Sequence, residues 1–107
     1  ISSILQKTSN YSLLTSDNNS IFTNEGATAQ VTFTLPSAVA GYSYTFVKLT
    51  DDNVVITAAS GDYIADSSAA GSITNSNVSE DFANITLFAI NASKWIIKAA
   101  DGHWTTT

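Results

Sequence analysis

The segment that most constrains the fold is Ile85 to Ile97, which reads ITLFAINASKWII and is the most apolar part of the chain. Residues alternate along its first half in the two-residue period of a β-strand, whose successive side chains point to opposite faces. The turn-favouring residues Asn91-Ala92-Ser93 then interrupt the apolar run, which resumes at Trp95. This pattern predicts a β-hairpin. A helix is the competing interpretation, but the short runs and the β-branched residues favour strands.

Both faces of this hairpin are apolar. Phe88 and Ile90 are expected on the face opposite Leu87, and Ile96 on the face opposite Trp95. A sheet that is covered on one side only carries polar residues on the other side, so a second layer must cover this hairpin. That layer is either another part of the same chain or a neighbouring subunit. We therefore take Phe88, Ile90 and Ile96 as candidate subunit contacts of a homo-oligomer.

Charge and composition exclude several classes of function. The 107 residues carry nine acids and four lysines, for a net charge of −5, and no arginine. Nucleic-acid binding needs clustered Lys and Arg, so neither nucleic acid nor an anionic membrane is an expected partner. No apolar run is long enough to cross a bilayer, and without cysteine there is no disulfide and no thiolate chemistry.

Because the chain starts at Ile1 and lacks methionine, we expect a processed product or a piece of a longer protein.

Alternating segments recur along the rest of the chain. Val31 to Leu35 alternates cleanly and ends at Pro36, which has no amide proton to give to a sheet. An aromatic-rich strand from Tyr42 to Val47 is separated by Asp51-Asp52-Asn53 from a second apolar run, Val54 to Ile56, which predicts another hairpin. Short strands separated by turn residues are typical of a sandwich or barrel.

The weaker segments lie at the start and between the hairpins. Residues 1–10 form either a lead-in segment or, at Ile4-Leu5, an edge strand, and Tyr11 to Thr15 reads as a strand. Ser37 to Ala40 has room for a single helical turn. We therefore predict one all-β domain over residues 1–107, a small antiparallel β-sandwich or barrel-like fold packed in a homo-oligomer.

No residue set indicates catalysis or metal binding. The single histidine, His103, with Asp62 and Asp66, is the only basis for a hydrolase, and the three would have to converge in one cleft. Asp51-Asp52-Asn53 and Asp17-Asn18-Asn19 offer oxygen ligands, but both lack the calcium-loop spacing and are explained by turn chemistry. We expect no catalytic residues, no metal and no cofactor, and thus no enzyme.

Two aromatic residues are the candidates for binding. Trp104 lies beside His103 near the end of the chain, and Tyr63 lies in the weakly periodic region between Ala58 and Asn84. Core packing is the ordinary role of an aromatic residue on a strand. An exposed pair would instead suit a carbohydrate-binding module that recognises glycans of a host surface, and this is the alternative function.

The motifs occur in a characteristic order. Their members are Thr34-Leu35-Pro36, Gly41-Tyr42-Ser43-Tyr44-Thr45-Phe46, Val55-Ile56-Thr57, Gly61-Asp62-Tyr63-Ile64, Ile85-Thr86-Leu87 with Ala89 and Trp95, and Gly102-His103-Trp104-Thr105. This order, which covers Asp17 to Thr105, resembles a small β module of tailed-bacteriophage tail fibres and other virion surface proteins.

The resemblance implies a non-enzymatic structural module of a phage virion, in a tail fibre or on the capsid surface, that contributes to host attachment. It also implies a homotrimer at the virion surface, in an extracellular setting. Other virion proteins or a host surface glycan would then be the partners.

Overall fold

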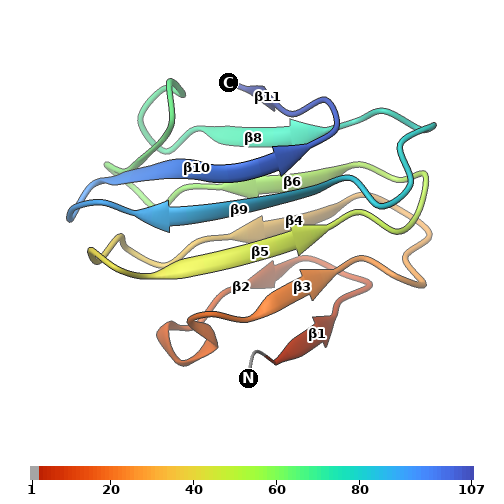
Figure 1. Cartoon of the computed structure of the whole chain (residues 1–107), viewed down its shortest axis with the longest axis horizontal. Coiled ribbons are helices and arrows are strands. Elements are labelled where there is room, and N and C mark those ends of the chain that lie inside the picture. The colour runs from red at the N-terminus through yellow and green to blue at the C-terminus, as the bar shows by residue number, and fades with distance from the viewer. Residues whose placement is uncertain (1–2) are drawn as a thin grey trace.

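The computed structural model describes residues 3–107, and the start of the predicted lead-in segment, residues 1 and 2, lies outside them. The described chain consists of short strands joined by loops and turns, and it contains no helix able to span a membrane. Its one helical element is the 3-10 turn η1 (Thr15–Asp17). The strands are β1 (Ile4–Gln6), β2 (Tyr11–Ser12), β3 (Ile21–Thr23), β4 (Val31–Thr34), β5 (Ser43–Val47), β6 (Val54–Thr57), β7 (Tyr63–Ile64), β8 (Ser72–Asn75), β9 (Asn84–Ala89), β10 (Lys94–Asp101) and β11 (Thr105–Thr106) (Figure 1).

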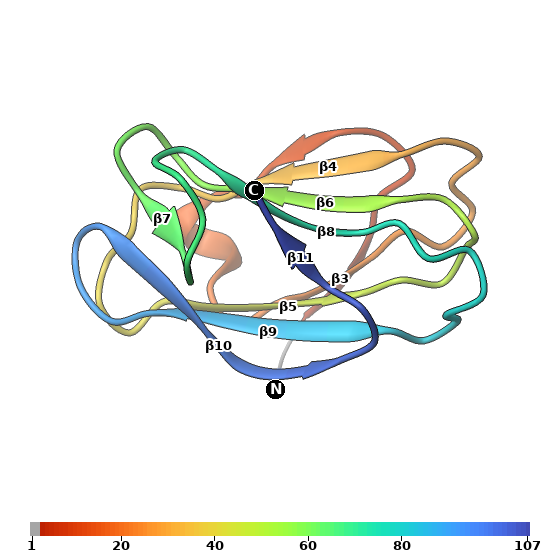
Figure 2. The same ribbon diagram turned by 90° about the horizontal axis from the view of Figure 1, so that it is seen from above.

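The strands form two sheets that pack face to face. Sheet A has the order β1-β3-β5-β9-β10-β7, and sheet B has the order β11-β8-β6-β4-β2. Figure 2 shows the two layers from above, with β5, β9 and β10 in one and β4, β6 and β8 in the other. The predicted all-β sandwich is therefore confirmed.

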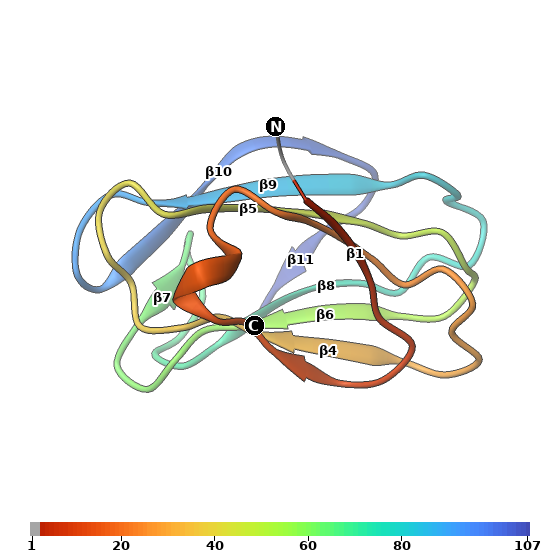
Figure 3. The ribbon, with the colours of Figure 1, turned by 90° about the horizontal axis from the view of Figure 1, so that it is seen from below.

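The first six strands alternate between the sheets, so that the chain winds as a flattened coil (Figure 3). Within sheet A, β1 pairs in parallel with β3 and β3 with β5; within sheet B, β2 pairs in parallel with β4 and β4 with β6. The sheets are thus mixed rather than purely antiparallel. The predicted hairpin around Asp51-Asp52-Asn53 is wrong, because β5 and β6 lie in different sheets and the turn connects the two layers.

The hairpin of β9 and β10 is confirmed. It is antiparallel, with Trp95 opposite Ala89 and Ile96 opposite Phe88, and β5 flanks β9 on its other edge. The register shifts by one residue between Ile97 and Ala99, so that Lys98 is the extra residue of a β-bulge.

The segments before β5 differ in detail from the prediction. Ile4-Leu5 lies in the edge strand β1, as one of the two interpretations had it. The strand at Tyr11 is only two residues long, because the chain turns into η1. The helical turn for which 37–40 had room does not form: the Ala38 N–H donates to the Asp62 carboxylate at 2.9 Å, and the Tyr42 N–H donates to the Val39 carbonyl oxygen at 3.0 Å in a tight turn.

Aromatic side chains from both sheets meet in the core. Phe22 and Phe46 of sheet A lie with ring centroids 5.5 and 5.2 Å from Phe33 of sheet B, and 5.7 Å from each other. Trp95 and Tyr44 extend this cluster along sheet A, with their ring centroids 5.7 Å apart. All five side chains are buried, and burial is the main cause that raises the pKa of the Tyr44 phenol to about 12.

Lys48 is an exception in this interior. It follows Tyr44 and Phe46 in the inward-facing positions, its side chain is fully buried, and its Nζ has no hydrogen-bond partner among the described residues. An unpartnered buried ammonium is costly, because it has given up water without gaining a protein acceptor.

We therefore expect Lys48→Met to stabilise the fold. Met fills a similar volume with an unbranched chain and removes the desolvated charge, so the free energy of unfolding should rise by about 1–3 kcal/mol. Urea denaturation followed by tryptophan fluorescence measures the change. Lys94→Met, at an exposed lysine, is the control and should lie within about 0.5 kcal/mol of the wild type. A less stable Lys48→Met variant would contradict this expectation.

Candidate functional site

The outer face of the β9–β10 hairpin remains partly uncovered by the rest of the domain. On the inner face, Leu87 and Trp95 are fully buried. On the outer face, Phe88 and Ile96 lie opposite each other and are only half-buried, and Ile90 is 43% exposed at the turn. The hairpin therefore has two apolar faces, and sheet B covers only one of them.

The two candidate binding aromatics do not form a common platform. Tyr63 lies on β7 and is 39% exposed, whereas Trp104 lies just before β11, is half-buried and packs against the core. The Trp104 indole Nε1 donates to the carbonyl oxygen of Asp101 at 3.0 Å. Neither ring takes part in any of the close aromatic pairs found among residues 3–107.

The residues considered for a hydrolase engage separate partners. Asp62 is buried and accepts from the Ala38 N–H, and Asp66 accepts from the Thr106 hydroxyl at 2.6 Å. The His103 ring bonds to the carboxylate of Glu80, and no hydrogen bond joins it to either aspartate. Within residues 3–107, no group of three or more His, Cys, Asp or Glu side chains is arranged to hold a metal ion. These contacts give the hydrolase hypothesis no shared site.

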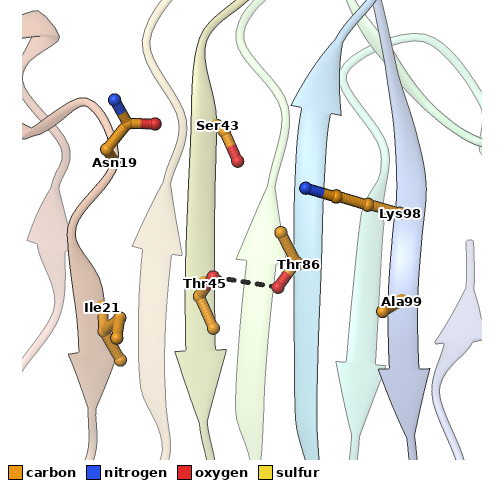
Figure 4. A pocket seen from close by; sticks show the side chains of 7 residues that line it. All are labelled: Asn19, Ile21, Ser43, Thr45, Thr86, Lys98 and Ala99. Carbon is orange, nitrogen blue, oxygen red and sulfur yellow. Dashed lines mark hydrogen bonds between the residues drawn. The ribbon is translucent and has the colours of Figure 1, made fainter. Parts of the chain in front are cut away.

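A hollow of about 490 Å³ lies on the outer face of sheet A (Figure 4). Four neighbouring strands contribute one row of mostly small side chains to its floor, in the register Ile21, Thr45, Thr86 and Ala99. The Thr45 and Thr86 hydroxyls lie 2.9 Å apart and hydrogen-bond to each other. The lining is completed by Asn19, Ser43 and Lys98.

Lys98 lies at this hollow, next to Ala99, which the β-bulge places on the same outer face. Figure 4 shows its side chain reaching from β10 over β9 toward β5, on the same face as Thr86. An adjoining hollow of about 310 Å³ is lined by Lys98 and Ser43 together with Gly41 and Phe88. Lys98 is thus the shared cation of two neighbouring concavities. It forms no salt bridge among the described residues, and every other side chain that lines them is uncharged.

Sequence reasoning missed this site for a definable reason. Along Trp95 to Ala99, apolar residues stand at 95, 97 and 99, so that an uninterrupted strand accounts for the pattern equally well. The one-residue shift is visible only in the pairing of β10 with β9.

Comparison with known proteins assigns no family. No family model matches the chain, and no curated protein is significantly similar to it.

Glu80 and His103 link the loop before β9 to the turn after β10. The Glu80 carboxylate accepts from the His103 N–H at 2.7 Å, from the His103 ring, and from Asn75 Nδ2 at 3.1 Å. The backbone bond from His103 is the main cause that holds the pKa of the Glu80 carboxyl below its ordinary value of 4.5.

We expect Glu80 to contribute to the acid sensitivity of the fold. Because its pKa is lower in the folded than in the unfolded state, the carboxylate stabilises the fold above the unfolded-state pKa, and this contribution is lost as the pH falls through the folded-state pKa. Glu80→Gln should therefore lose less stability than the wild type between about pH 7 and about pH 3, as measured by urea denaturation. Asp81→Asn is the control, and an equal effect of both variants would contradict the assignment.

Proposed function

We propose that this chain is a non-enzymatic structural module of a phage virion, in a tail fibre or on the capsid surface, and that it works as a subunit of a homo-oligomer, with a trimer favoured. The observation that carries the proposal is the uncovered outer face of the β9–β10 hairpin, where Phe88, Ile90 and Ile96 meet solvent in the single domain. Apolar side chains gathered on one face are typical of a protein contact.

The order of motifs along the chain supports the virion assignment. The segments that carry the resemblance are structural in this fold: Tyr44 and Phe46 are core residues of β5, Ile64 is a core residue of β7, and Leu87 is a core residue of β9. A module whose recurring residues build a sandwich rather than a reactive cleft suits a structural role.

The distribution of charge favours a head-to-tail arrangement of subunits. Lys94 and Lys98 alternate with Ile96 on the outer face of β10, in a protein whose net charge is −5. The other two lysines are engaged within the domain. The Lys7 Nζ lies 3.8 Å from the centroid of the Tyr11 ring, and Lys48 is buried. Two copies that packed through this same face would bring lysines together, whereas packing against a different, acidic surface of the next copy pairs unlike charges. Such a contact closes into a trimer when each copy is rotated by about one third of a turn from the last, and forms an open filament when the rotation does not close.

Sedimentation of the domain at micromolar concentration tests the proposal. We expect a mass of three times the 11.3 kDa chain. Ile90→Ser should weaken the assembly by about tenfold or more, because a side chain that is buried between subunits would no longer be apolar.

Val78→Ser is the matched control for this variant. Val78 is an apolar residue that is 64% exposed in the loop between β8 and β9, which precedes β9, whereas Ile90 follows it, and its replacement should leave the mass unchanged. A wild-type domain that sediments as a stable monomer contradicts the proposal.

A further inference from the structure

We propose that the hollow on the outer face of sheet A binds a saccharide that carries a carboxylate, with the Lys98 ammonium as the group that pairs with the carboxylate. This inference does not rest on the proposed virion role. It combines an unpaired cation beside a β-bulge, an uncharged polar lining and an apolar wall, in two adjoining concavities that share Lys98.

The first step is the position of Lys98. β-Bulges interrupt the hydrogen-bond ladder and re-aim side chains, and they recur beside binding sites. Here the bulge follows Ile97, which pairs with Leu87, and the next pair in the ladder is Ala99 with Thr86. Lys98 lies on the outer face in alternation with Lys94 and Ile96, and the extra residue puts Ala99 on that face beside it. The Lys98 side chain reaches over β9 toward Ser43 (Figure 4). A regular strand would have turned one of these two neighbours to the inner face.

The second step is the charge of the ligand. Lys98 has no acidic partner within residues 3–107, and the rest of the lining of both hollows is neutral. A single ammonium with no neighbouring cation neutralises one negative charge. Phosphate esters and nucleic acids are bound through several basic groups, so a monoanionic carboxylate fits better than a phosphate.

The third step is the rest of the lining. The hydroxyls of Ser43, Thr45 and Thr86 each both donate and accept hydrogen bonds, and Asn19 adds a carboxamide. The half-buried Phe88 ring forms an apolar wall of the adjoining hollow. A sugar ring presents hydroxyl groups at its edge and C–H groups on its faces, which matches this mixture. The volumes of about 490 and 310 Å³ fall within the usual range for small-ligand sites.

The hollow is separate from the residue used above to test assembly. Its floor is the row of Ile21, Thr45, Thr86 and Ala99 across the middle of sheet A. Ile90 instead lies at the turn that joins β9 to β10. Ile90→Ser therefore changes self-association without altering the hollow, whereas Phe88 and Lys98 belong both to the face that we propose as the subunit contact and to the lining of the hollows.

Titration of the ¹⁵N-labelled domain with monosaccharides tests the inference. We expect glucuronate or galacturonate to shift the amide signals of Ser43, Thr45, Thr86 and Ala99, with neutral glucose binding at least about tenfold more weakly. Acetate and inorganic phosphate are the other two probes. Each should bind more weakly than the uronate, since acetate lacks the ring and phosphate needs more than one cation.

Lys98→Met and Lys94→Met form the variant pair. Lys98→Met keeps the unbranched stem and removes the charge, and should lower uronate affinity by about tenfold or more, to the level of glucose. Lys94→Met removes an equal charge from the same strand and face but lies outside the hollow, and should retain binding.

Several results would overturn the inference. These are equal binding of glucuronate and glucose, equal losses in the two lysine variants, phosphate or acetate binding as tightly as the uronates, or no signal shift at about 10 mM ligand. Sedimentation of the same samples and of Ile90→Ser keeps the two proposals apart. A dissociated Ile90→Ser domain that binds no uronate contradicts only this one, and a wild-type monomer that binds uronate contradicts only the proposed assembly.

Discussion

The packing of Phe22, Phe33 and Phe46 across the two sheets is the contact on which the rest of the structure depends. The three rings come from strands β3, β4 and β5, which are consecutive in the chain but alternate between the layers. Each sheet has an apolar inner face that is stable only when the other sheet covers it, and this cluster is where the layers meet. The outer positions of the same strands, such as Thr32 and Thr45, are then left for solvent or for ligands.

Winding between layers also explains how parallel strands exist here without helices. Parallel neighbours need a crossover connection, which is most often a helix that covers the sheet. In this chain the crossover is a strand of the opposite sheet, so that β4 connects β3 to β5 and β3 connects β2 to β4. One element thus serves both as the connection for one layer and as a member of the other. Within residues 3–107 no further element covers the outer face of sheet A, so the hollow at Lys98 is accessible in the single domain.

Features that local chemistry determines could be predicted from the sequence, whereas pairing between distant segments could not. The alternation of Val31 to Leu35 and the turn at Asn91-Ala92-Ser93 both have local causes, and the structure contains the corresponding strand and hairpin. The turn at Asp51-Asp52-Asn53 was interpreted wrongly because turn residues reverse the chain without fixing whether the next strand joins the same sheet. A short stretch of sequence does not reveal which strands pair in parallel or in what register. It does not reveal the bulge at Lys98 either. Lys48 did leave a signal, since it continues the inward positions of Tyr44 and Phe46.

The coil formed by the first six strands has a consequence for the order in which the fold assembles. The paired residues Ile4 and Ile21, Ile21 and Thr45, and Phe33 and Ile56 are all well separated along the chain, so each parallel contact requires a long loop to close before any hydrogen bond compensates its entropy. The β9–β10 hairpin, closed by three turn residues, needs no such search. We therefore expect the β9–β10 hairpin to form first during folding. The N-terminal strands pair later, because each of them depends on strands that are distant in the chain. Slow, cooperative refolding follows from this connectivity, and during that interval the unpaired strand edges stay open to other chains.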